Sequence, residues 1–177
     1  EEEVGMLLSW AINNNKKSSY IRLMSLPVAT NFKLPNGYQP VIGKGVQLSP
    51  GTENILVAYG PQMLSTAMTI AANIQQEIGM EIGVVNLPWL NEVDALWLGD
   101  LLRPVSELFV IDNHYGIGGL GDRLARLVAS EITIDVNMTC IGLEDIPACG
   151  TNEEILSRHR LDVQGIEKVV KRVINRS

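Results

Sequence analysis

An almost wholly apolar run, followed at once by a helix-type segment, recurs along this sequence. Its first copy, residues 54–59, ends at Gly60-Pro61, a dipeptide that turns the chain. Apolar residues then keep helical spacing over residues 62–78, and Gly79 is placed to end that helix. Because such an apolar run is typical of a strand buried on both faces, the pattern predicts a sheet that helices cover on both sides.

The same alternation continues to the end of the chain. Further strands are predicted at residues 81–87, 108–111 and 136–141, and further helices at residues 92–102 and 120–130. Two closing helices are predicted within residues 151–174, capped by Asn152 and Asp162. Strands and helices that alternate through short connections form parallel strands with right-handed crossovers. The predicted fold class is therefore an α/β, three-layer α/β/α sandwich with a mostly parallel, roughly five-stranded sheet.

The first part of the chain has a different pattern. Residues 1–15 predict an amphipathic helix, and the alternating residues 20–24 predict a strand. Four of the eight prolines fall within residues 25–52, which indicates a linker that ends in a short strand around residues 41–48.

Composition excludes several classes of protein. The 20 acidic residues outnumber the 14 basic ones, for a net charge of −6, so no nucleic-acid partner is expected. No apolar stretch is long enough to span a membrane, so no transmembrane segment is expected. Cys140 and Cys149 lack the spacing of a zinc or redox motif, and two cysteines are too few for a disulfide scaffold. A cytoplasmic chain with reduced thiols is expected.

The string Asp112–Gly121, between a predicted strand and helix, is the most conspicuous candidate site. Gly116, Gly118 and Gly121 satisfy the G-x-G-x-x-G spacing of dinucleotide-binding turns. However, the string follows the third buried strand rather than the first, and no acidic residue stands at the ribose-binding position. We therefore interpret these glycines as positions of positive φ and close packing.

His114 is the candidate for proton transfer, because it stands where a parallel strand ends and ligands usually bind at that edge. The alternative is a loop histidine with a structural role, since no second catalytic group lies at a fixed spacing from it. The other candidates for a loop or interface role are Asp112, Asn113, Gly118 and Gly119. No set of residues has metal-ligand spacing.

Four segments, in this order, resemble the C-terminal domain of the transketolase family. They are Gly43–Gly60, with its Gly-Lys-Gly start; Val85–Asp94; Asn113-His114 with Gly118–Gly121; and Gly150–Ile166. The resemblance extends over residues 41–177. Residues 1–24 resemble the last helix and strand of the preceding pyrimidine-binding domain, which leaves residues 25–40 as the linker.

The resemblance implies an activity and also a limit. Members of this family transfer a two-carbon ketol or related acyl unit by means of thiamine diphosphate with Mg²⁺ or Ca²⁺. The cofactor lies between a pyrophosphate-binding and a pyrimidine-binding domain, on the same chain or on a partner subunit, and neither the G-D-G metal motif nor the activating Glu is in this sequence. We therefore expect a chain that is inactive alone, binds no cofactor by itself, forms a homodimer, and supports dimerisation and the substrate entrance.

Two departures from the family pattern bear on the substrate. Ser25 stands where transketolases and deoxyxylulose phosphate synthases carry a phosphate-binding Arg, and Asn113 replaces an acidic residue before the loop histidine. Whether the substrate is phosphorylated is therefore left open. The alternative from another class is a free-standing anion-binding, nucleotide-binding or regulatory module that uses the turn at residues 116–121. A third, a nicotinamide-dependent oxidoreductase, is weakened by the misplaced glycine fingerprint.

Overall fold

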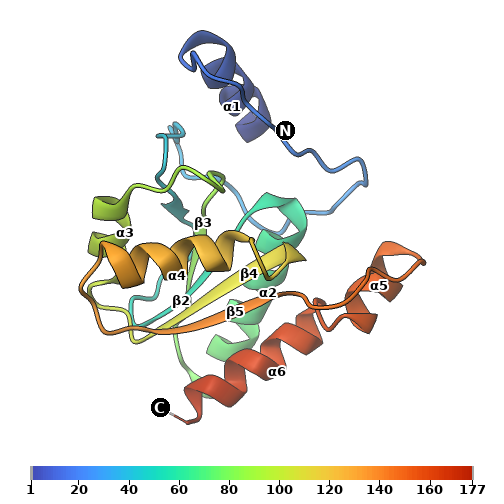
Figure 1. The fold of residues 1–177 in the computed structure, drawn as a ribbon. Helices are drawn as coiled ribbons and strands as arrows, with labels where there is room; N and C mark the ends of the chain where they lie inside the picture. The colour runs from blue at the N-terminus through green and yellow to red at the C-terminus, as the bar shows by residue number, and fades with distance from the viewer. Residues whose placement is uncertain (1, 177) are drawn as a thin grey trace.

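Five strands form one sheet in the order β1-β3-β2-β4-β5 in the computed structural model, which describes residues 2–176 (Figure 1). The strands are β1 (Val46–Gln47), β2 (Asn54–Ala58), β3 (Gly83–Asn86), β4 (Glu107–Tyr115) and β5 (Asn137–Leu143). All neighbouring pairs are parallel except β1 and β3. The predicted mostly parallel sheet is confirmed.

Helices cover both faces of the sheet, which confirms the three-layer sandwich (Figure 1). One face carries α2 (Gly60–Ile78) and α6 (Val163–Ile174), and the other carries α3 (Ala95–Leu102) and α4 (Leu120–Ser130). In the central strand β2, Leu56 belongs to the core under α2 and α6, whereas Ile55 and Val57 belong to the core under α3 and α4. Because successive side chains of a strand point to opposite faces, an apolar residue is needed at each of these positions.

Helix ends follow the sequence signals with one exception. Gly79 ends α2 in the left-handed region with φ 72°, and Asp162 caps α6 by accepting a hydrogen bond from Gly165 N at 2.9 Å. The prediction that Asn152 caps the helix before α6 is wrong. The cap of α5 (Asn152–Arg158) is Thr151, which forms a reciprocal capping box with Glu154.

The predicted strand at residues 20–24 is also wrong. The helix before it is present as α1 (Glu2–Asn13), but residues 20–24 form no strand, and Tyr20 and Leu23 are 91% and 59% exposed. A segment of alternating polar and apolar residues forms a strand only when a second strand supplies hydrogen-bond partners. None of the described strands pairs with this segment. The strand expected around residues 41–48 is reduced to β1.

Strand β4 is longer than predicted and brings the candidate residues to its end. The predicted strand ended at Ile111, but β4 continues to Tyr115 through a register shift against β5 after Ile111. Asp112, Asn113 and His114 therefore lie on a strand end rather than in a loop. No helix in residues 2–176 is long and apolar enough to cross a membrane.

Candidate functional site

The carboxyl ends of the parallel strands gather polar side chains from distant parts of the chain. Tyr59 follows β2, Asn86 ends β3, and Asp112 lies near the end of β4. The N-terminal helix reaches the same edge, because Asn86 Nδ2 donates a 2.6 Å hydrogen bond to Glu3 of α1. Ligands of open parallel sheets usually bind at this edge, so the candidate site is in the expected place.

Asp112 is the buried centre of this edge, with only 3% of its surface exposed. One of its carboxylate oxygens accepts a hydrogen bond from the Tyr59 hydroxyl, and the other accepts one from Leu120 N at 2.9 Å. Gly119 leaves room for this carboxylate, since a Cβ at Gly119 would lie 2.5 Å from Asp112 Oδ2. Both oxygens are thus held inside the protein, which suits a structural or positioning role.

Arg22 brings the N-terminal segment to the same place. Its guanidinium donates a 2.7 Å hydrogen bond to Asn113 Oδ1, across 91 positions of sequence. Burial raises the pKa of Tyr59, and its hydrogen bond to Asp112 raises it further, while the charge of Arg22 and a hydrogen bond with it act in the opposite direction. The Tyr59 hydroxyl donates to Asp112, and the Arg22 guanidinium lies close to its oxygen. We did not single out Arg22 or Tyr59 as site residues from the sequence, because nothing local in their sequence indicates a contact with residues 112–113.

His114 lies beside this cluster but is not part of it. Its side chain is exposed, and its ring meets the ring of Tyr115 edge-on at 5.7 Å. Within residues 2–176 the His114 imidazole makes no hydrogen bond or ion pair. The structure thus brings no second acid or base to His114, and a role in proton transfer stays a prediction.

The glycines of the string have the packing role expected of them at two positions. Gly118 has φ 75°, in the left-handed region, and its N–H donates a 2.7 Å hydrogen bond to Asp122 Oδ2. A Cβ at Gly121 would lie 2.6 Å from Cys140 Sγ on β5, so this glycine lets α4 approach the edge strand.

A half-open cavity of about 340 Å³ lies next to Arg22. One wall is the segment 22–26, and the opposite wall comes from α5 and the chain around it. Two of its polar groups are tied to the protein: His159 Nε2 accepts from Ala148 N at 3.1 Å, and Asn152 Nδ2 donates to Gln62 Oε1 at 3.3 Å. This cavity exists because the N-terminal segment lies against the sheet edge.

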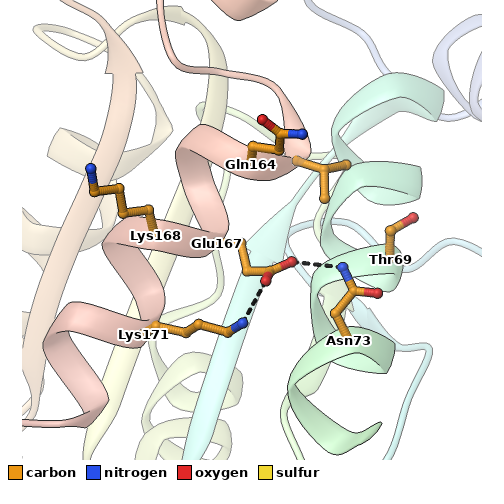
Figure 2. Close-up of a pocket in the computed structure, with 7 residues that line it drawn as sticks. Thr69, Asn73, Gln164, Glu167, Lys168 and Lys171 are labelled. Carbon is orange, nitrogen blue, oxygen red and sulfur yellow. Dashed lines mark hydrogen bonds and ion pairs between the residues drawn. The ribbon is translucent and has the colours of Figure 1, made fainter. Parts of the chain in front are cut away.

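A second, shallow pocket lies between α2 and α6 and has a structural role. Figure 2 shows Asn73 and Lys171 both directed at Glu167, with hydrogen-bond distances of 2.7 Å each, and Lys171 also pairs with Glu77 at 2.5 Å. Burial acts to raise the pKa of Glu167, but the hydrogen bonds from Asn73 and Lys171 outweigh it and the pKa is lowered. The cluster ties the two helices together. No group of three or more His, Cys, Asp or Glu residues in the described part of the chain could hold a metal ion.

Comparison with known proteins places the chain in a family. The family model described as "Transketolase, C-terminal domain" matches residues 43–166, which is more than half of the chain. The chain belongs to the transketolase C-terminal domain family. The resemblance of the four sequence segments is thereby confirmed.

Relatives of this transketolase C-terminal domain are much longer proteins. The 1-deoxy-D-xylulose-5-phosphate synthase of Clostridium beijerinckii is 27% identical over 183 residues, which cover 97% of this chain and 27% of that protein. The synthase of Pseudomonas aeruginosa is 29% identical over 148 residues, which cover 82% of this chain and 22% of that protein. The chain thus spans about a quarter of the length of these curated relatives.

Solved structures support the same fold. A structure described as "Split gene transketolase, inactive beta4 tetramer" superposes with a TM-score of 0.70 at 23% identity, covering 78% of this chain and 45% of that one. The transketolase of Campylobacter jejuni superposes with a TM-score of 0.52 at 16% identity, covering 75% of this chain and 20% of that one. At such identities the likeness concerns the fold of this transketolase C-terminal domain alone.

Proposed function

We propose that this chain is the C-terminal domain of a thiamine diphosphate-dependent enzyme that transfers a two-carbon ketol or related acyl unit. In this proposal the domain supports dimerisation and shapes the substrate entrance, and the cofactor is held by other domains. The observation that carries the proposal is the family match over residues 43–166. Its relatives named as deoxyxylulose phosphate synthases are enzymes of which such a domain is about a quarter.

The described residues contain no group of three or more His, Cys, Asp or Glu that would hold the cofactor's metal ion. A divalent cation such as Mg²⁺ needs several oxygen ligands, and the described residues contain no suitable group of carboxylates. Asp112, the buried carboxylate of the sheet edge, already uses both oxygens for Tyr59 and Leu120. We therefore assign the cofactor to a pyrophosphate-binding and a pyrimidine-binding domain, on the same polypeptide or on a partner subunit, and α1 with residues 14–24 to the end of the latter.

Support for an interface comes from exposed apolar side chains. Ile117, after β4, and Ile146, after β5, are 91% and 87% exposed, and Tyr115 at the end of β4 is 40% exposed. Large apolar side chains in water are unfavourable, and when they gather they mark contact surfaces. We propose that this edge meets a second subunit or a neighbouring domain, with His114 beside the entrance.

Ketol transfer by the assembled protein tests the proposal. The 177-residue chain is assayed alone and as part of a polypeptide, or mixture of subunits, that contains the cofactor-binding domains, with thiamine diphosphate and Mg²⁺. We expect activity only in the assembly, and a lower kcat/KM for His114→Ala but not for the control Leu96→Ala, whose side chain is 84% exposed on α3. Ketol transfer by the chain alone, or none by the assembly, would contradict the proposal.

The alternative of a free-standing anion-binding module has less support. An anion site needs free backbone N–H groups in the turn. Here the N–H groups of Gly118, Gly119 and Leu120 donate to Asp122, to the Gly116 carbonyl and to Asp112. These three N–H groups of the turn are thus satisfied from within the protein.

A further inference from the structure

A chain of hydrogen bonds leads from the interior of the domain to its N-terminal segment. Leu120 N and the Tyr59 hydroxyl both donate to the buried carboxylate of Asp112. The same Tyr59 hydroxyl contacts Arg22, and Arg22 also donates to Asn113 Oδ1 at 2.7 Å. We call Asp112, Tyr59, Asn113 and Arg22 the relay.

The direction of each bond in the relay is fixed by chemistry. An ionised carboxylate only accepts hydrogen bonds, so the single proton of the Tyr59 hydroxyl is directed at Asp112. The oxygen of Tyr59 then presents its lone pairs outward, where only a donor fits, and a guanidinium has donors alone. Asn113 Oδ1 adds a second acceptor for the same guanidinium. Asp112 thus orients the Tyr59 hydroxyl so that its oxygen is open to a donor from Arg22.

The N-terminal segment depends on this contact. Residues 20–24 pair with none of the described strands, and Leu23 and Leu26 are 59% and 53% exposed. Ile21 and Met24 are partly buried, so apolar burial holds the segment only in part. Through Arg22 the segment forms a hydrogen bond with Asn113 at the sheet edge. Because residues 22–26 form one wall of the cavity of about 340 Å³, release of Arg22 would remove that wall.

We propose that Asp112 and Tyr59 are positioning residues that hold Arg22, and with it residues 20–26, against the carboxyl edge of the sheet, and so determine the shape of the substrate entrance. The statement about the entrance rests on the proposed function. The statement that the relay holds Arg22 does not, and it can be tested on the chain by itself.

Tryptic cleavage of the folded 177-residue chain after Arg22 measures how firmly the segment is held. We expect Tyr59→Phe, which removes only the bridging hydroxyl, to speed up this cleavage at least about fivefold. Asn113→Ala should do the same, and both variants should leave cleavage after the exposed Arg172, in α6, unchanged. The matched control is Tyr20→Phe, because the 91% exposed Tyr20 makes no hydrogen bond in the described structure. Cleavage after Arg22 at the wild-type rate in Tyr59→Phe would overturn the proposal, whether or not Asn113→Ala speeds it up.

The kinetics of the assembled enzyme separate a positioning role from a merely structural one. A residue that shapes the entrance affects substrate binding, so we expect Tyr59→Phe to raise KM about tenfold and to leave kcat within about twofold. A faster cleavage with unchanged KM would overturn the assignment to the entrance. If the wild-type assembly shows no ketol transfer, the proposed function fails, while the cleavage rates still decide whether the relay holds Arg22.

Discussion

Asp112 accepts a 2.9 Å hydrogen bond from Leu120 N, and so a side chain from the end of β4 caps α4 from eight residues away. The residue in the N-cap position itself, Gly119, has no side chain to offer. This long-range cap explains why a carboxylate is buried where a strand meets a helix, since the first N–H groups of a helix lack partners within it.

The cap predicts a loss of stability on substitution. Asp112→Ala should lower the free energy of unfolding by about 2 kcal/mol, because it leaves Leu120 N and the Tyr59 hydroxyl without their acceptor. Denaturant unfolding followed by circular dichroism measures the change. The control Asp135→Ala, at an exposed position outside the strands and helices, should stay within about 0.5 kcal/mol. Equal losses in the free energy of unfolding of the two variants would mean that Asp112 does not cap α4.

Close packing of α4 on the edge strand predicts a size limit at Gly121. Gly121→Ala should destabilise the protein by about 1–3 kcal/mol, because its Cβ would lie 2.6 Å from Cys140 Sγ and 2.8 Å from Cys140 Cβ. Gly116→Ala is the matched control, since a Cβ there meets nothing within 4 Å. The comparison is made by thermal unfolding of both variants, and a Gly121→Ala protein as stable as Gly116→Ala would contradict the prediction.

Glu167, which accepts hydrogen bonds from Asn73 of α2 and from Lys171 of its own helix α6, predicts a pH-dependent contribution to stability. The pKa of Glu167 is lowered in the folded state, so the carboxylate contributes stability above its ordinary pKa, and this is lost as pH falls through the lowered value. Glu167→Gln should therefore cost about 1 kcal/mol at pH 7, and the difference from wild type should shrink at pH 4 and below.

Unfolding of both proteins between pH 3 and pH 8 checks this prediction. Glu144→Gln, at an exposed position in the chain after β5, is the control for loss of one negative charge. A difference between wild type and Glu167→Gln that stays constant over this range would show that the carboxylate's charge has no part in the contact.

Docking of α1 should have the opposite pH dependence. Burial raises the pKa of Glu3, although hydrogen bonds from Asn86 and Tyr38 oppose it. A raised pKa means that the folded state favours the protonated form, so this group's contribution is present below its ordinary pKa and is lost as pH rises through the raised value. Glu3→Gln, which keeps an acceptor for Asn86 and Tyr38, should therefore dock α1 more firmly than wild type at pH 8 and equally at pH 4.

Fluorescence reports on this docking, because Trp10 of α1 lies edge-on against Trp89 with ring centres 5.0 Å apart. Hydrogen exchange of the α1 amides gives a second measure. Weaker protection of α1 in Glu3→Gln than in wild type at pH 8 would show that the negative charge itself is needed, contrary to the prediction.

Features that depend on neighbours in the sequence could be predicted, and those that depend on distant neighbours could not. Gly79 ends α2 and Asp162 caps α6 as expected, because both signals act within one helical turn. By contrast, residues 20–24 alternate like a strand and pair with none, and the residues expected in a loop after Ile111 continue β4. Strand pairing depends on residues far away in the sequence, so the local pattern predicted the structure of both segments wrongly.

The sequence by itself determined the sandwich and the order of its elements, because a strand buried on both faces and an amphipathic helix each leave a periodic signal. The family followed from the resemblance of four sequence segments, not from periodicity. The sequence also placed Asp112, Asn113 and His114 at the carboxyl edge of the sheet, where ligands of open parallel sheets usually bind. Only the tertiary structure decided that Asp112 accepts hydrogen bonds from Tyr59 and Leu120 and that Asn113 accepts one from Arg22. It also decided that the His114 side chain is exposed. The physical reason is that hydrogen bonds between residues 53 and 91 positions apart form only once the core has brought the strand ends together.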